Sequence, residues 1–301
     1  MKFTKMHGAG NDYVFVDGTN IIADWSEVAS RVSDRHFGIG SDGLIVAVNS
    51  TSADIRMRMW NADGSESEMC GNGIRCFAKF VVEKNIISVS SNLLHVETGA
   101  GILPVTLINQ EGRVLRAKVE MGIPSLRSDE IPINKKALQP NDYAFLDESL
   151  IDGMGIDRES LVFDAGITLE HQIYKLTGVS TGNPHVTCFL DTPVNDFSLD
   201  IIGPLVEYHE AFPNRVNFHI VNVIDRKRVR TRTWERGSGQ TLACATGATA
   251  IVVAARLHNF VDNAVIVEVP GGELIINWDG RGSALMEGPI AEVFSGDFPL
   301  E

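Results

Sequence analysis

Two of the four cysteines stand where a thiol can act as a base. Cys70 and Cys244 each precede a segment with helical character, so each is expected at a helix N-terminus. There the partial positive charge of the backbone N–H groups lowers the pKa of a thiol from about 8.5 toward neutrality. A pair of such thiols suits inversion at a carbon atom, because one removes a proton while the other delivers one to the opposite face.

The same helix starts offer free backbone N–H groups. Such donors would hold a substrate α-carboxylate and stabilise the negative charge that develops on it as the α-proton leaves. They belong to Gly71, Asn72, Ala245 and Thr246. The other two cysteines are expected to pack in the core, Cys76 inside the first helix and Cys188 in a strand.

Periodicity indicates the elements that must position these thiols. After Cys70, apolar residues recur at helical spacing and form one face of a helix; they are Ile74, Phe77, Ala78, Val81 and Val82. The segment 248–255 is apolar on nearly every side, which favours a helix enclosed by a sheet. Short strands joined by Gly-rich turns follow, a pattern typical of antiparallel hairpins.

The chain also matches itself when shifted by about 170 positions. Five pairs of segments carry the match: 10–17 with 182–191, 60–64 with 234–237, 70–73 with 244–247, 96–101 with 267–272, and 111–113 with 279–281. In the first pair, Gly10-Asn11-Asp12-Tyr13 aligns with Gly182-Asn183-Pro184-His185. This is the pattern of a duplication, and it would place the two thiols on opposite sides of one cleft.

The predicted fold is therefore α/β (α+β), with two pseudo-symmetric lobes, each an antiparallel or mixed sheet curled into a barrel-like shape around a central helix. We expect an N-terminal lobe over 1–121, to which 288–301 return, and a C-terminal lobe over 122–287. The stretch 125–172 has no counterpart in the first half and is expected to be an elaboration or a loop.

Composition excludes several classes of function. The chain has 301 residues, and its 39 acidic and 26 basic side chains give a formal charge of −13, which disfavours nucleic acid and anionic membranes as partners. No apolar run reaches the length of a membrane span, and the start has no apolar core like that of a signal peptide, so we expect a cytoplasmic protein. The histidines form no metal-ligand spacing, and no metal is expected.

Three local patterns are misleading. The segment 38–43 fits G-x-G-x-x-G, but a strand follows where a dinucleotide site needs a helix. The segment 178–182 fits G-x-S-x-G, but it also leads into a strand, so no nucleophile elbow is expected. Alternating arginines over 226–232 are read as one solvated face of a strand.

Several motifs in register over almost the whole chain make the sequence resemble diaminopimelate epimerase. They are Met6 to Asp12, Gly38 to Gly43, Asn61 to Ser65, Met69 to Cys76, Gly182 to His185, Arg215 to Asn217, Trp234 to Gly237 and Ala243-Cys244. The resemblance implies a cofactor-free, two-lobed enzyme that interconverts LL- and meso-diaminopimelate on the path to lysine and cell-wall precursors. It also implies a homodimer and a small-molecule substrate.

By the same resemblance, Cys70 and Cys244 are the acid/base pair, and His185 and Glu235 match positions that assist the thiols. The substrate would be held by Asn11, Asn61, Asn183, Asn217, Glu235 and Arg236, with the backbones at Gly71-Asn72 and Ala245-Thr246 taking the reacting carboxylate. An acidic partner, a forked basic partner and neutral amides also suit the distal ammonium and carboxylate of diaminopimelate.

Three departures from the family pattern concern substrate preference. Ala245 replaces an expected Gly, and its Cβ would make a positive φ costly beside the second thiol. Gln240 stands where an acidic residue is frequent, and Gly43 where some members have Gln. Two alternatives stay open: a racemase or epimerase of another amino acid on the same fold, and a thiol–disulfide redox or sensor protein.

Overall fold

The computed structural model describes residues 1–68, 70–89, 91–110 and 113–299. It divides into two compact units, one made of 1–120 and 287–301 and the other of 121–286. The predicted fold class is confirmed, because the chain forms a mixed α/β fold with many strands in mixed pairing and few helices.

The first unit contains nine strands and two helices within its described residues. The strands are β1 (Lys2–Gly8), β2 (Asn11–Asp17), β3 (Gly43–Val48), β4 (Ile55–Asn61), β5 (Glu66–Ser67), β6 (Leu93–Thr98), β7 (Gly101–Gln110), β8 (Arg113–Glu120) and β18 (Ala291–Asp297). The helices are α1 (Trp25–Ser33) and α2 (Gly71–Glu83). Pairing is antiparallel between β1 and β2, parallel between β2 and β3, antiparallel between β3 and β4, and parallel between β4 and β6.

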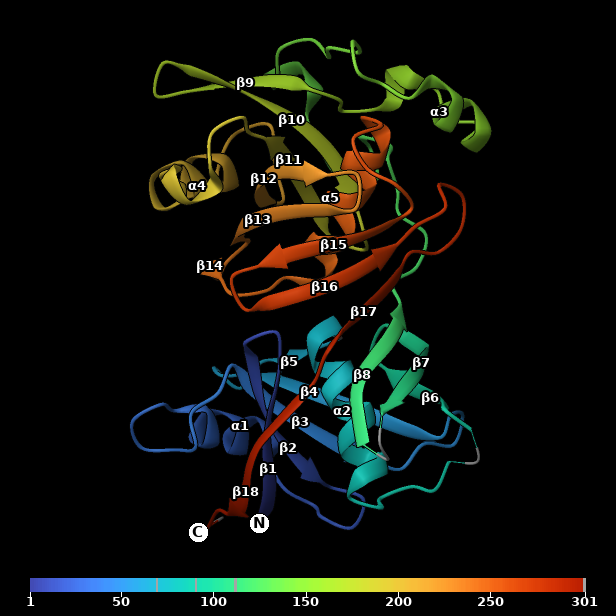
Figure 1. Ribbon diagram of the computed structural model, residues 1–301. Coiled ribbons are helices and arrows are strands. Elements are labelled where there is room, and N and C mark those ends of the chain that lie inside the picture. Colours follow the sequence, from blue (N-terminus) through green and yellow to red (C-terminus); the bar gives the residue numbers. More distant parts are fainter. Residues whose placement is uncertain (69, 90, 111–112, 300–301) are drawn as a thin grey trace. The chain divides into compact units, whose positions relative to one another are not determined.

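The two helices of this unit cover opposite faces of the sheet. Helix α2 contacts β1, β2, β3, β7 and β8 and lies among these strands, whereas α1 packs on β3 and β4 (Figure 1). Eleven of the thirteen residues of α2 are buried, as its apolar composition requires of an enclosed helix. The α1 face adds a second core layer that includes Trp25, Val46 and Trp60.

The second unit contains eight complete strands and three α-helices in the part of the chain that is described. The strands are β9 (Ala165–Leu169), β10 (Gln172–Ser180), β11 (Pro184–Phe189), β12 (Asn217–Asp225), β13 (Arg228–Glu235), β14 (Gly239–Thr241), β15 (Ala264–Val269) and β16 (Gly272–Asn277). The helices are α3 (Glu148–Met154), α4 (Leu199–Glu207) and α5 (Ala245–Leu257), with 3-10 turns at Lys135–Ala137, Arg158–Ser160 and Val194–Asp196. A further strand, β17 (Leu285–Pro289), spans the division between the units.

The second unit repeats the pairing order of the first. Pairing is antiparallel between β10 and β11, parallel between β11 and β12, antiparallel between β12 and β13, and parallel between β13 and β15. Helix α5 contacts β10, β11, β12, β15 and β16, and α4 packs on β12, β13 and β14 (Figure 1). The internal sequence match therefore corresponds to the same order of elements in both units.

The stretch without a counterpart, 125–172, holds α3, two of the 3-10 turns and β9, which pairs with β10. Both misleading glycine patterns behave as expected. Residues 38–42 form a loop that leads into β3, and 178–182 join the end of β10 to β11.

Candidate active site

The first predicted thiol, Cys70, is the N-cap residue of α2. Its backbone is extended, with φ −135° and ψ 119°, and its Sγ accepts a hydrogen bond from the N–H of Gly73 at 3.4 Å. The thiol thus faces the positive end of the helix dipole. The N–H groups of Gly71 and Asn72 belong to the same first turn, the arrangement that binds anions at helix starts.

Asn11 and Tyr13, from the start of β2, lie against this thiol. The hydroxyl of Tyr13 donates to Oδ1 of Asn11 at 3.0 Å and lies 3.2 Å from Sγ of Cys70. Sγ of Cys70 is itself 3.5 Å from Oδ1 of Asn11. Burial raises the pKa of Tyr13 well above its ordinary value, and the neighbouring Cys70 and Asp42 raise it further. Tyr13 is therefore a neutral hydroxyl beside the thiol.

A charged cluster fixes the amide of Asn11. Oδ2 of Asp42 accepts from Nδ2 of Asn11 at 2.6 Å and from the N–H of Asp12 at 3.0 Å. Arg35 donates to Asp12 at 2.9 Å and to Asp42 at 2.8 Å, and Lys5 pairs with Asp12. Burial raises the pKa of Asp42, and the Asp12 charge adds to that increase; burial also acts on Asp12, but Arg35 and Lys5 outweigh it and lower its pKa. With Nδ2 bound to Asp42, Oδ1 of Asn11 is directed at Tyr13 and Cys70.

The other two asparagines predicted in this unit have different settings. Asn72 is 2% exposed; its Nδ2 donates to Oδ1 of Asn11 at 3.4 Å, and its Oδ1 accepts from Arg75 at 2.9 Å. Asn61 ends β4 and is exposed, with its Nδ2 donating to Oγ of Ser65 at 3.0 Å. Asn72 thus contacts Asn11, which lies beside Cys70. Among the described contacts of Asn61, none reaches Asn11, Tyr13 or Cys70.

The second thiol, Cys244, is the N-cap residue of α5. Its backbone is again extended, with φ −121° and ψ 111°, and its Sγ lies 3.5 Å from Oγ1 of Thr246. The residue is 6% exposed. Burial raises the pKa of Cys244 well above its ordinary value, the Glu235 carboxylate raises it further, and the Thr246 hydroxyl opposes this. Cys244 is therefore held as a thiol.

The backbone at Ala245 is helical. It is the first residue of α5 and is not among the described residues with positive φ. The lack of a positive φ here agrees with the expectation that the Cβ makes such a φ costly beside the second thiol.

A chain of hydrogen bonds runs from Thr233 on β13 to Thr246, beside Cys244. Thr233 Oγ1 and His219 Nδ1 are 2.9 Å apart, His219 Nε2 and His185 Nδ1 are 2.9 Å apart, and His185 Nε2 lies 2.8 Å from Oδ1 of Asn183. Nδ2 of Asn183 then donates to Oγ1 of Thr246 at 3.4 Å. In the parallel pairing of β11 with β12, His185 is in register with Asn217. His219 stands two residues after Asn217 on the same face of β12, so the two histidine rings are neighbours.

The direction of each bond in this chain follows from the acceptors. An amide Oδ1 only accepts, so His185 carries its proton on Nε2 and its Nδ1 accepts from His219. His219 is then protonated on Nε2, and its Nδ1 accepts from the hydroxyl of Thr233. Burial lowers the pKa of His219 to about 3, and burial with the neighbouring His219 and Arg236 lowers that of His185 well below its ordinary value. Both rings are neutral, and both nitrogens of His185 are engaged.

The remaining predicted residues of this unit meet at the end of β13. Asn217 accepts from the N–H of Arg236 at 2.9 Å and donates to the carbonyl of Pro184 at 2.8 Å. The guanidinium of Arg236 donates to the carbonyl of Asn214 at 3.1 Å, and the Glu235 carboxylate accepts from the hydroxyl of Thr241. Asn217 thus ties the strand that carries His185 to the turn that carries Glu235 and Arg236.

Glu207 supports the same turn and was not predicted from the sequence. This carboxylate, at the end of α4, is 2% exposed. It accepts from Nε1 of Trp234 at 2.7 Å and from the N–H of Gly237 at 2.9 Å. It therefore anchors both ends of the segment that presents Glu235 and Arg236.

Sequence reasoning also missed Tyr13, Asp42 and His219. Alternation along a strand offers one available signal, because His219 stands two residues after Asn217 and so shares a face of β12 with it. Tyr13 stands two residues after Asn11 in the same way and aligns with His185 in the repeat. The contact of Asp42 with Asn11 crosses 31 positions and leaves no local signal.

Cys76 and Cys188 occupy the core, as predicted. Cys76 is fully buried and Cys188 is 3% exposed, and burial raises the pKa of each to about 12. Over the described residues, no group of histidine, cysteine or acidic side chains could hold a metal ion. Within the same ranges, no helix is long and apolar enough to cross a membrane.

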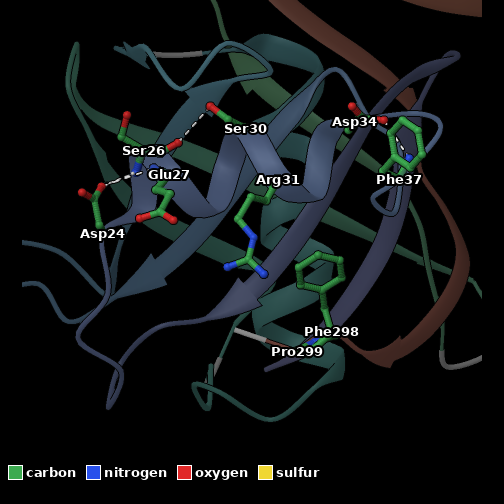
Figure 2. A pocket seen from close by; sticks show the side chains of 9 residues that line it. All are labelled: Asp24, Ser26, Glu27, Ser30, Arg31, Asp34, Phe37, Phe298 and Pro299. Carbon is green, nitrogen blue, oxygen red and sulfur yellow. Dashed lines mark hydrogen bonds between the residues drawn. The ribbon is translucent and has the colours of Figure 1, made fainter. Parts of the chain in front are cut away.

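The first unit has a surface hollow beside α1. Figure 2 shows it between α1 and the C-terminal segment, where the guanidinium of Arg31 lies 5.8 Å from the ring of Phe298. Asp24 and Glu27 line another side (Figure 2). Its described lining contains none of the residues predicted for the active site.

Comparison with known sequences gives one family. The family described as diaminopimelate epimerase matches residues 3–126 and 177–293. The unmatched stretch between these ranges contains α3 and β9. The chain is 42% identical over 302 residues to the diaminopimelate epimerase of Methanococcus maripaludis (strain C5), and 44% identical over 302 residues to that of Agathobacter rectalis. Each alignment covers 100% of both chains.

Solved structures with low identity share the fold. A PhzF-family phenazine biosynthesis protein from Bacillus anthracis matches with a TM-score of 0.65 at 16% identity, covering 100% of this chain and 99% of that one. A probable proline racemase from Agrobacterium radiobacter K84 also matches with a TM-score of 0.65, at 14% identity, covering 100% of this chain and 93% of that one. At these identities the likeness concerns the fold alone.

Proposed function

The chain belongs to the diaminopimelate epimerase family, and from this premise we propose that it interconverts LL- and meso-diaminopimelate with Cys70 and Cys244 as the acid/base pair. The reaction serves lysine and peptidoglycan precursor biosynthesis. The observation that carries the proposal is the matched placement of the two thiols. Each is the N-cap of the enclosed helix in its own unit. The Cys70 sulfur lies 3.5 Å from Oδ1 of Asn11 at the start of β2, and the Cys244 sulfur lies 3.5 Å from Oγ1 of Thr246 in the first turn of α5.

In the proposed reaction one sulfur takes the α-proton and the other supplies a proton to the opposite face of the same carbon. The carbon–hydrogen bond breaks, its electron pair stays on the substrate, and a sulfur–hydrogen bond forms. The second sulfur loses its proton as the new carbon–hydrogen bond forms. This scheme assigns one thiol to each proposed lobe, 1–121 with 288–301 and 122–287.

The two thiols are proposed to rest in different protonation states. Cys244 is buried beside Glu235, and both features raise its pKa, which supports a resting thiol that acts first as the proton donor. Cys70 is less buried and has the Gly73 N–H and the Tyr13 hydroxyl around its sulfur, which supports a resting thiolate that acts first as the base. Glu235 would assist by passing a proton from solvent to Cys244 between turnovers, while Cys70 releases the proton that it took from the substrate.

The reacting α-carboxylate is proposed to bind the first-turn N–H groups of both helices, from Gly71, Asn72, Ala245 and Thr246. Those dipoles also stabilise the extra charge that reaches the carboxylate when the α-proton leaves. The tautomer of His185, held by His219, keeps Asn183 and Thr246 in place beside Cys244. In this proposal His185 acts through Asn183.

The distal ammonium and carboxylate are proposed to meet the remaining polar groups. Arg236 supplies a planar donor set for the carboxylate once it leaves the carbonyl of Asn214. Asn11, Asn61, Asn183 and Asn217 supply neutral amides. Of these, Asn11 and Asn217 are already oriented by Asp42 and Pro184, so they offer preformed positions.

We also propose that the enzyme works as a cytoplasmic homodimer. Sedimentation of the purified protein at several concentrations measures the oligomer directly; a single species with the mass of one chain at all concentrations would contradict it.

Single cysteine variants test the central assignment. Cys70→Ser and Cys244→Ser should each lower the LL-to-meso rate by about 10² to 10⁴, the usual worth of a general acid or base. Cys76→Ser and Cys188→Ser are the matched controls, because each also removes one thiol, and both should stay active. Full activity in either of the first two variants contradicts the assignment.

The same assay separates the two alternatives. A panel of other amino acids, tested for α-proton exchange, would reveal a racemase of different substrate preference. A redox or sensor protein would work in its oxidised form, so activity of the fully reduced protein on diaminopimelate excludes that role.

A further inference from the structure

The hydroxyl of Tyr13 stands between two groups that cannot both receive its single proton. It lies 3.0 Å from Oδ1 of Asn11 and 3.2 Å from Sγ of Cys70. Tyr13 is 4% exposed, and its ring packs edge-on against Phe15 at a centroid distance of 6.4 Å. The position of the hydroxyl is therefore fixed by packing, and only the direction of its proton is variable.

The protonation state of the sulfur decides that direction. When Cys70 is a thiol, the Tyr13 hydroxyl donates to Asn11, and the sulfur proton is directed at the phenolic oxygen or at Oδ1 of Asn11, 3.5 Å away. When Cys70 is a thiolate, it is the stronger acceptor, and a hydrogen bond to an ionised group is about twice as strong as a neutral one. The hydroxyl then turns to the sulfur, while Oδ1 of Asn11 keeps the amide of Asn72 at 3.4 Å.

The second unit gives the comparison that makes this contact distinctive. His185 aligns with Tyr13 in the repeat and donates to the equivalent asparagine, Asn183, at 2.8 Å. Its other nitrogen is engaged by His219, so it has no further donor for the sulfur of that unit. In both units an aromatic ring residue donates a hydrogen bond to the asparagine. Of these two residues, Tyr13 is the one with a described contact to a thiol.

We propose that Tyr13 is a further catalytic residue, whose hydroxyl stabilises the Cys70 thiolate by donating to it and returns to Asn11 when the sulfur is protonated. As the thiolate takes the substrate α-proton, the new sulfur–hydrogen bond replaces the hydrogen bond from Tyr13. The hydroxyl proton rotates to Oδ1 of Asn11 and is never transferred. No heavy atom needs to move.

The proposal rests on Cys70 as the base, and its test does not use epimerase activity. Tyr13→Phe removes one oxygen and keeps the buried ring. The charged and titratable groups that act on Tyr13 and Cys70, namely Asp42, Arg75 and Cys76, are the same in the variant and the parent protein. Tyr174→Phe is the matched control, because its hydroxyl is exposed and bonded to Gln172.

The measurement is the rate of Cys70 alkylation by iodoacetamide from pH 6 to pH 11, followed by mass spectrometry of the peptide that contains this residue. The reagent reacts with thiolate, so the rate reports ionisation. In Tyr13→Phe the rate at pH 7 should fall about tenfold, the midpoint of the profile should rise by about one pH unit, and the limiting rate at high pH should be unchanged. Tyr174→Phe should match the parent protein.

Two results would overturn the proposal. A Tyr13→Phe profile that coincides with the parent profile means that the hydroxyl does not stabilise the thiolate. A rate that falls equally at all pH values means that the variant changes access to the sulfur. Should Tyr13→Phe fail to fold, replacement of all tyrosines by 3-fluorotyrosine gives the opposite test, because the more acidic hydroxyl must lower the midpoint, and an unchanged or higher midpoint refutes the proposal.

The alkylation result and the epimerase result are independent. A shifted profile together with a fully active Cys70→Ser enzyme would refute the proposed function and leave the Tyr13 contact established. An unshifted profile together with an inactive Cys70→Ser enzyme would refute the role of Tyr13 and leave the proposed function standing.

Discussion

Substitution of Gly247 by alanine tests the hydrogen-bond chain behind the second thiol. Gly247 lies in the first turn of α5, where a Cβ would overlap Cε1 of His219 and come within 3.1 Å of Sγ of Cys244. His219 is fully buried and is bonded at 2.9 Å on both sides, to His185 and to Thr233. The glycine is therefore required for the imidazole to lie against the helix start.

The expected cost follows from these distances. To restore ordinary carbon contact, the His219 ring must withdraw by about 1 Å. A displacement of that size takes a 2.9 Å hydrogen bond beyond its usual range. Two buried groups then lose their partner at about 1–3 kcal/mol each, whereas glycine to alanine inside a helix otherwise stabilises by about 1 kcal/mol. We expect Gly247→Ala to lower the free energy of unfolding by about 1–5 kcal/mol.

Urea unfolding, followed by tryptophan fluorescence and far-UV circular dichroism, measures this change. Gly73→Ala is the matched control, because Gly73 occupies the same position in α2. Within 3.0 Å, a Cβ at this position would meet only the terminal methyl of Ile45, at 2.7 Å. A flexible methyl can move, so the control should cost about 1 kcal/mol or less. In the double variant Gly247→Ala/His219→Ala the two effects should be strongly non-additive.

A stabilised Gly247→Ala protein would refute the reasoning. It would mean that intrinsic helix propensity outweighs the contact with His219. Strict additivity in the double variant would equally show that the alanine methyl and the His219 ring do not meet.

Two further predictions concern buried carboxylates. Burial raises the pKa of Asp164 to about 6. The folded chain therefore keeps a proton on this carboxyl group at pH values where the unfolded chain has already released it. The stability that this proton gives is lost as pH rises through 6. Asp164→Asn should stabilise the protein by about 1–2 kcal/mol at pH 8, after discounting for solvent screening, and by nearly nothing at pH 4. Asparagine also tolerates the positive φ of 45° at this position. Equal stabilisation at both pH values in thermal unfolding would contradict this prediction. Glu207→Gln should lower the free energy of unfolding by about 1–3 kcal/mol, because one of the two acceptor oxygens becomes an amide donor that faces the N–H of Trp234 or Gly237. It should also raise KM, because the turn that carries Arg236 loses its anchor. An unchanged KM would show that the turn keeps its position without the carboxylate.

Local patterns predicted the elements that hold the thiols. Helical spacing after Cys70 and the apolar segment before Ala255 correspond to α2 and α5, and both cysteines are N-caps as predicted. The repeat also predicted that the two halves share an order of elements. These features depend on contacts between residues close in sequence, which is why periodicity detects them.

The supporting groups could not be predicted because they depend on strand pairing across long separations. His219 reaches His185 only through the parallel register of β11 and β12, and Asp42 reaches Asn11 through the parallel register of β2 and β3. Glu207 lies in α4, outside the segments that carried the alignment.

Solvent deuterium in the first moments of reaction tests the two-thiol assignment most directly. LL-diaminopimelate is incubated with fully reduced protein in heavy water, and both substrate and product are isolated before a tenth of the substrate is consumed. With a separate acid and base, the meso product carries deuterium at the inverted α-carbon while the recovered LL substrate carries almost none, and Cys70→Ser and Cys244→Ser abolish this labelling of product. Equal labelling of substrate and product, or undiminished labelling in either variant, would contradict a mechanism with one sulfur on each face of the carbon.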